Sequence, residues 1–193
     1  LSRTLVGTLL LSGGCALCAW FWARPLMALL TTDAYLTQPG QPGSDAALRL
    51  LSVSMFCNGI IVFSFYALLA SHAWRSLVAS LGLGALLALL LNAFLIPPLG
   101  FIGASMTSIA VHALLAVLLF AAAKTGIRFP LPWGGLIRWA AWMLALALLL
   151  ALVSPLLTSS AATLVGIAGA GLFSLLLARA LGLLSLLLPR EEA

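Results

Sequence analysis

The sequence predicts an all-α protein, a polytopic membrane helix bundle of about six transmembrane helices, and three observations support this fold class. Hydrophobic residues make up 64% of the 193 residues and charged residues only 7%, which is far more apolar than a soluble domain. From residue 76 to residue 123 no side chain carries a formal charge. Apolar stretches of about 20 residues, the length that crosses a hydrocarbon core of about 30 Å, recur along the rest of the chain.

The boundaries of the expected spans lie where charge, proline or glycine interrupts the apolar pattern. The first span ends before the one substantial polar connection, residues 31–47, whose Pro, Gly, Gln and Asp residues are typical of turns. The second ends before Arg75. The third and fourth share the uncharged stretch, and Pro97, Pro98 and Gly100 are expected to form the reversal between them. The six expected spans are 5–30, 48–70, 76–97, 102–123, 136–156 and 161–188.

The charged residues predict the orientation. Short connections make successive helices antiparallel, and basic residues concentrate at alternate connections. One expected side carries Arg3, Arg75, Lys124, Arg128, Arg138 and Arg190, and the other carries Arg24, Asp33, Asp45 and Arg49. The positive-inside rule therefore predicts a cytoplasmic carboxyl terminus and a periplasmic 31–47 loop. The tryptophans near the span ends are expected to form interfacial belts, namely Trp20, Trp22, Trp133, Trp139 and Trp142.

The polar residues exclude several classes of function. A net charge of +5 reflects topology rather than nucleic-acid binding, because the basic residues lie at span ends. Carboxylate pairs, metal-ligand clusters and phosphate-binding glycine loops are absent from the pattern, so neither an enzyme nor a cofactor or metal site is expected. Cys15, Cys18 and Cys57 lie in apolar segments and are expected to be buried thiols.

The segment around the expected reversal carries a family pattern. It reads Asn92-Ala-Phe-Leu-Ile-Pro-Pro-Leu-Gly-Phe-Ile-Gly-Ala-Ser-Met-Thr107. This segment resembles the polysaccharide exporters and oligosaccharide flippases of the multidrug/oligosaccharidyl-lipid/polysaccharide superfamily, in which Asn, an apolar run, Leu-Ile-Pro, Gly and Gly-Ala-Ala recur at this spacing. Pro98 and Ser105 depart from that pattern, at positions where the family has a basic or polar residue and Ala. The stretches that begin at Arg24 and Leu48 are also similar to the family.

The resemblance covers about residues 3–127 and implies the C-terminal lobe of a MATE-like two-lobe flippase. Residues 1–127 would be that lobe's helices, and residues 128–193 would be two additional transmembrane helices and a cytoplasmic tail. The chain would then be a fragment whose N-terminal lobe is missing. The implied partners are a lipid-linked (undecaprenyl diphosphate) oligosaccharide, membrane lipids and a possible coupling ion, and the implied location is a bacterial inner membrane.

Two polar residues near the bilayer centre are the main candidate site residues. Asn58 and His112 lie halfway along their spans and are expected to face inward, because exposure to lipid would be costly. Ser105 and Ser108 share a helix face with His112. An interhelical hydrogen bond is one reading of His112, and a role in the translocation path or in proton coupling is the other. Arg49, at the periplasmic start of its helix, is a candidate for attracting the diphosphate or for simple anchoring.

Other features are structural, and several functions stay open. Small residues recur every fourth position from Ser76 to Asn92 and from Ala162 to Gly182, which favours close helix packing. Gly103 is expected to permit the tight turn together with Pro97 and Gly100. Two other transporters would use the same fold: a lipid II flippase and a cation-coupled drug exporter. The stretch Phe65-Tyr66-Ala67 resembles a stretch of lipid II flippases. A glycan-assembly membrane enzyme and a structural membrane subunit are the alternatives from other classes.

Overall fold

The helices were located in a computed structural model that describes residues 2–127 and 129–184. Six long helices in this part of the chain are apolar enough to cross a membrane, so the protein is an all-α polytopic helix bundle, as predicted. The elements are α1 (Ser2–Phe21), α2 (Ala23–Leu30), η1 (Asp33–Tyr35), α3 (Ser44–Ala70), α4 (Trp74–Leu99), α5 (Phe101–Ile127), α6 (Trp133–Val153), η2 (Ser154–Leu156) and α7 (Ser160–Ala180). Of the last expected span, 185–188 lie outside the described residues.

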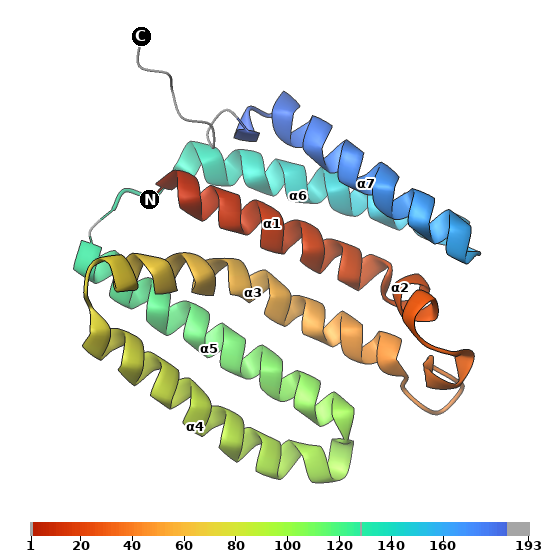
Figure 1. Cartoon of the computed structure of the whole chain (residues 1–193), viewed down its shortest axis with the longest axis horizontal. Helices are drawn as coiled ribbons and strands as arrows, with labels where there is room; N and C mark the ends of the chain where they lie inside the picture. Colours follow the sequence, from red (N-terminus) through yellow and green to blue (C-terminus); the bar gives the residue numbers. More distant parts are fainter. Residues whose placement is uncertain (1, 128, 185–193) are drawn as a thin grey trace.

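The six long helices lie side by side in essentially one layer (Figure 1). Their spatial order is α4, α5, α3, α1, α6 and α7, and each neighbouring pair in this row is in contact. One apolar core joins α1, α3, α4 and α5, and a second joins α1, α6 and α7. Asn58 in α3 is exposed and His112 in α5 is half-buried, so the described helices do not enclose the two residues that were expected to face inward.

The expected first span is broken into two helices. α1 ends at Phe21 and α2 begins at Ala23. Pro25 accounts for the break, because proline lacks the N–H that would bond to the carbonyl of Phe21 four residues earlier and its ring crowds that carbonyl. Trp22 at the break is 1% exposed, and its indole Nε1 donates a hydrogen bond to the carbonyl of Leu150, 3.1 Å away. This bond joins the start of α2 to α6.

Two of the five expected belt tryptophans belong to the core. Besides Trp22, Trp142 is 2% exposed and donates from Nε1 to the carbonyl of Ser174 at 3.1 Å. Both bonds satisfy an indole donor inside an apolar core, where an unpaired N–H would be costly. Trp20 and Trp133 are exposed, in agreement with an interfacial position.

The reversal between α4 and α5 is made by one residue. Pro97 and Pro98 lie inside α4, which continues to Leu99, so of the three residues expected to form the reversal only Gly100 lies beyond the helix. Both prolines lie in the last turn, where their fixed φ is compatible with a helix although each removes one bond to a carbonyl four residues earlier. Gly100, with φ 56°, turns the chain, and its N–H bonds to the carbonyl of Ile96 at 2.7 Å. A residue with a side chain rarely adopts this φ.

Close packing of α4 on α5 follows the small-residue stripe. Ser80 and Gly84 are buried, and a Cβ on Gly84 would stand 2.8 Å from Cδ2 of Leu115. Gly103 is buried at the other end of the pair, against the backbone of Leu95. These contacts agree with the packing roles expected for Gly103 and for Ser80 and Gly84 of the stripe, whereas Ser76 is exposed.

Charged residues separate between the two ends of the layer. Successive long helices are antiparallel, so α2, the 31–47 loop and Gly100 lie at one end, here called the loop end, and residue 2 and residue 184 lie at the other (Figure 1). Arg24, Asp33, Asp45 and Arg49 belong to the loop end, and Arg3, Arg75, Lys124, Arg138 and Arg179 to the opposite end. This separation agrees with the predicted alternation; Arg128 and Arg190 lie outside the described residues.

Cysteine labelling tests the orientation. In a chain with Cys15, Cys18 and Cys57 replaced by serine, an introduced Gln41→Cys thiol is expected to react with an impermeant maleimide in intact spheroplasts. A Gly126→Cys thiol, at the end rich in basic residues, is expected to react only after permeabilisation. Both positions are exposed. The reverse labelling pattern would place the loop end in the cytoplasm.

Candidate functional site

A groove with polar residues lies between α1 and α3 at mid-length. Its volume is about 250 Å³, and it is lined by Thr8, Leu11, Ser12, Cys15, Met55, Asn58, Gly59 and Val62. Asn58 is exposed rather than turned inward. Cys15 is exposed as well, contrary to the expectation of a buried thiol, because α1 and α3 meet at Gly59 and leave this side of both helices open.

The ring of His112 bonds within its own helix. Its Nδ1 lies 2.8 Å from the carbonyl oxygen of Ser108 and 3.3 Å from the Ser108 hydroxyl oxygen. Nδ1 therefore donates a hydrogen bond to that carbonyl. The other ring nitrogen, Nε2, has no hydrogen-bond partner among the described residues. The interhelical bond, which was one of the two readings of His112, is therefore not formed with any described residue. His112 is half-buried and presents a free polar atom.

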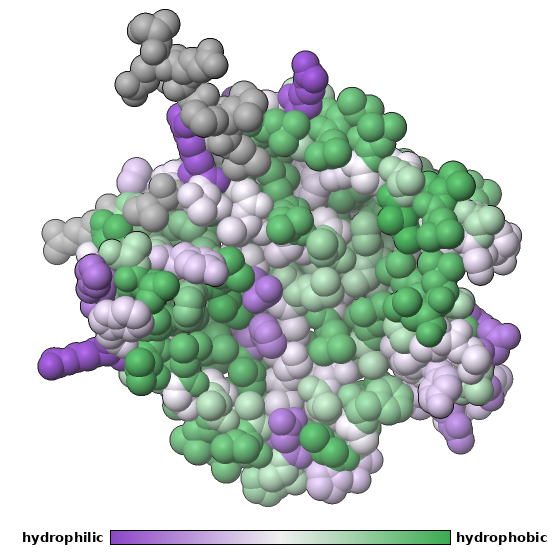
Figure 2. Space-filling model, in the orientation of Figure 1, coloured by the Kyte–Doolittle hydropathy of each residue, from purple (hydrophilic) through white to green (hydrophobic). Residues whose placement is uncertain are grey.

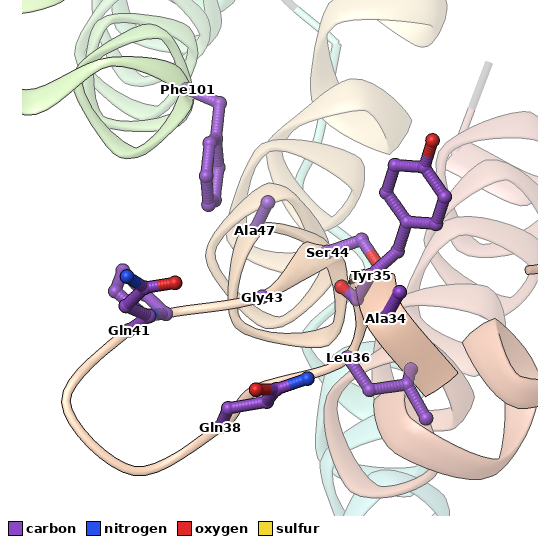
Figure 3. A pocket seen from close by; sticks show the side chains of 10 residues that line it. Ala34, Tyr35, Leu36, Gln38, Gln41, Gly43, Ser44, Ala47 and Phe101 are labelled. Atoms are coloured by element: carbon purple, nitrogen blue, oxygen red, sulfur yellow. Dashed lines mark hydrogen bonds between the residues drawn. The ribbon is translucent and has the colours of Figure 1, made fainter. Parts of the chain in front are cut away.

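A second hollow lies at the loop end. It has a volume of about 390 Å³ and is lined by Ala34, Tyr35, Leu36, Gln38, Gln41, Pro42, Gly43, Ser44, Ala47 and Phe101. Figure 3 shows these side chains coming from the loop, from the start of α3 and, in the case of Phe101, from the start of α5. The lining carries no charge, and we call it the loop hollow.

Hydrogen bonds hold the wall of the loop hollow in place. Asp45 is buried, and its Oδ1 accepts bonds from both the N–H and the hydroxyl of Thr37, each at 2.7 Å. The Thr37 hydroxyl oxygen in turn accepts from the N–H of Gly43 at 3.0 Å. The Ser44 hydroxyl donates to the carbonyl of Tyr35 at 2.9 Å. The side-chain amides of Gln38 and Gln41 form no such bonds among the described residues, so they are free to bind a ligand.

The loop hollow places Asn58 and His112 on the same face of the layer. Ala47 of α3 and Phe101 of α5 both line this hollow. Asn58 lies three helical turns beyond Ala47, and His112 lies three turns beyond Phe101. Asn58 therefore lies about 16 Å farther along α3 than Ala47, and His112 lies equally far along α5 from Phe101. Each pair lies on one side of its helix. Figure 2 shows hydrophilic residues over the middle of α3 and α5 within a mostly apolar face.

Two other expected site residues are not part of this face. Ser105 is buried, and its hydroxyl donates to the carbonyl of Phe101 at 3.0 Å, which is a bond within α5. Arg49 is exposed in a different hollow together with Arg24. Asn58 and Arg49 are half a helical turn out of phase, since each residue advances a helix by about 100°. The structure therefore groups Asn58, Ser108 and His112, and separates Arg49 from them.

The fold and this face define a class: a multi-pass membrane helix bundle with a polar face at mid-depth. Within the described residues, no group of three or more His, Cys, Asp or Glu side chains could hold a metal ion. Comparisons with protein-family models, with curated proteins and with solved structures found no match to this chain. The assignment of a function therefore depends on the site.

Proposed function

We propose that this chain forms one lobe of a flippase, which moves an undecaprenyl-diphosphate-linked oligosaccharide across a bacterial inner membrane for surface polysaccharide synthesis. One observation carries the proposal: Asn58 and His112 offer polar atoms without a hydrogen-bond partner among the described residues, at one depth and on one face of an apolar helix layer. Such groups are costly against lipid. We infer that the polar face lines a water-filled cavity and that a second lobe packed against it would close this cavity.

The loop hollow supports a glycan as the transported group. Sugar hydroxyls both donate and accept hydrogen bonds, and a glutamine amide offers both functions. Gln38 and Gln41 supply two such amides, and the exposed Tyr35 and Phe101 supply flat apolar surfaces beside them. Uncharged polar and aromatic groups in a hollow of about 390 Å³ suit a small polar ligand. The hollow lies at the loop end, where the cavity would release its cargo.

The arrangement also supports transport rather than catalysis. The mid-depth face offers an amide, a hydroxyl and an imidazole, but no carboxylate pair for general acid–base chemistry among the described residues. Transport would draw on a gradient or on the substrate's own disequilibrium. His112 is the side chain on this face suited to carry a proton if transport is coupled to one. The carboxyl terminus would lie in the cytoplasm, at the end rich in basic residues.

Export measurements test the proposal. His112→Ala and Asn58→Ala, made in the whole gene, are expected to lower surface glycan export by about fivefold or more, since a lost hydrogen bond to a polar ligand costs about 1–3 kcal/mol. Membrane abundance should stay near wild type, because neither side chain joins two helices. His72→Asn is the matched control, because His72 is exposed at the end opposite to the loop.

Two outcomes would contradict this function. Unchanged export in both variants at unchanged abundance would remove the polar face from the translocation path. A parallel fall of export and abundance would make these residues part of the packing instead. A drug-exporter function predicts a third pattern, in which drug resistance falls while the surface glycan is retained.

A further inference from the structure

We propose that Arg24 and Arg49 form a binding site for a phosphate or diphosphate group at the level of the lipid headgroups. They line one hollow of about 370 Å³ at the loop end, together with Phe21, Pro25, Ala28, Asp33, Leu36, Ser154, Leu157 and Thr158. A bundle that transports nothing would still bind this group, so the site does not depend on the proposed function.

The fold brings the two arginines together from distant parts of the chain. Arg24 lies in the first turn of α2, and the bond from Trp22 to the carbonyl of Leu150 fixes the start of that helix. Arg49 lies in the second turn of α3. Both side chains are exposed, so the guanidinium groups remain accessible from the surrounding membrane surface.

The charges in this hollow are not neutralised by internal pairs. Neither guanidinium group forms a hydrogen bond or an ion pair with another described residue. Asp33 lines the hollow too and is likewise unpaired with any described residue, which leaves one net positive charge. Guanidinium groups bind phosphate oxygens through paired N–H donors. Ser154 and Thr158 add two hydroxyl groups to the lining.

The position of the hollow identifies the class of ligand. All of its charged residues lie at the loop end of their helices, where the polar headgroups of a bilayer lie. The hollow also shares Leu36 with the loop hollow, so the two hollows adjoin each other. A lipid whose phosphate binds beside Arg24 and Arg49 would place the rest of its polar group next to the loop hollow, which Tyr35 lines. A phospholipid, a prenyl diphosphate and a free diphosphate all carry the phosphate chemistry that this hollow suits.

Binding measurements with the purified chain test the site. The probes are farnesyl diphosphate, phosphatidylglycerol, inorganic diphosphate and, as an uncharged control, farnesol. Arg24→Gln and Arg49→Gln are each expected to raise the Kd for a phosphate probe by about fivefold or more, and the double variant should abolish binding. Asp33→Asn should lower the Kd, because it removes the negative charge from the hollow. Arg138→Gln, at the opposite end, should leave binding unchanged.

Comparing the Kd values of the probes shows which kind of molecule supplies the phosphate. Preference for farnesyl diphosphate over phosphatidylglycerol supports a prenyl diphosphate, equal binding of both supports any anionic lipid, and binding of inorganic diphosphate alone supports a free anion. Arg24→Lys and Arg49→Lys keep the charge, so they should retain part of the binding if the variants fold. Equal Kd values for wild type and the double Gln variant with every phosphate probe would overturn the site. Farnesol binding equal to farnesyl diphosphate binding would overturn it too.

Discussion

Replacing Gly103 by leucine is expected to remove most of the folded protein from the membrane. A Cβ at this position would overlap the carbonyl group of Leu95 and stand 3.1 Å from the nitrogen of Ile96. These are backbone atoms of α4, so no change of rotamer relieves the overlap and α4 must move away from α5. Overpacking of this kind costs about 3 kcal/mol or more when the backbone has to shift, which is about a hundredfold in the ratio of folded to unfolded protein.

Membrane abundance and the unfolding temperature in detergent measure this effect. Gly82→Leu is the matched control, because Gly82 lies in α4 and a Cβ added there would meet no atom within 4 Å. The control should keep wild-type abundance. Equal abundance and equal unfolding temperature of the Gly103 and Gly82 variants would show that the contact at Leu95 does not limit stability.

Gly59→Leu is expected to have the second-largest effect, because it separates α1 from α3. A Cβ on Gly59 would overlap the hydroxyl oxygen of Ser12 and stand 2.9 Å from the carbonyl oxygen of Thr8. The serine hydroxyl can rotate, but the carbonyl belongs to the backbone of α1. We expect a cost of about 2 kcal/mol and a fall of several degrees in the unfolding temperature.

The α1–α3 contact joins the two apolar cores, so its loss should also make unfolding less cooperative. Gly171→Leu in α7, where a Cβ would meet no atom within 4 Å, is the control for added bulk on a membrane helix. An unfolding transition as sharp and as high as that of the control would contradict a tight α1–α3 contact.

The spans could be predicted because hydropathy and length decide them in a bilayer. Their internal breaks were less predictable. The helix is interrupted beside Pro25, whereas the last turn of α4 accommodates Pro97 and Pro98, and the sequence pattern alone did not distinguish the two cases. Trp22 and Trp142 were expected at the interface because tryptophan is common there, and only the positions of Leu150 and Ser174 show that they are core residues.

The candidate site was predicted in part. Polar residues at mid-depth single out Asn58 and His112, but the side they face depends on neighbouring helices, and a row of helices has no closed interior. The separation of Arg49 from Asn58 could have been found from their helical phase alone. The meeting of Arg24 with Arg49 could not, because it depends on how α2 packs beside α3.

The outward side of α4 has a consequence for how this protein can change over generations. Few residues of α4 are buried, and the main neighbour of this helix is α5. Its exposed apolar residues include Val78, Leu86, Leu89 and Phe94. Lipid chains adapt to any apolar shape, so these positions are constrained by hydrophobicity alone and can exchange Leu, Ile, Val and Phe freely. Ser80 and Gly84 face α5 and cannot drift in this way. Related chains should therefore vary along α4 with a helical period, with fixed small residues on one side and interchangeable apolar residues on the other.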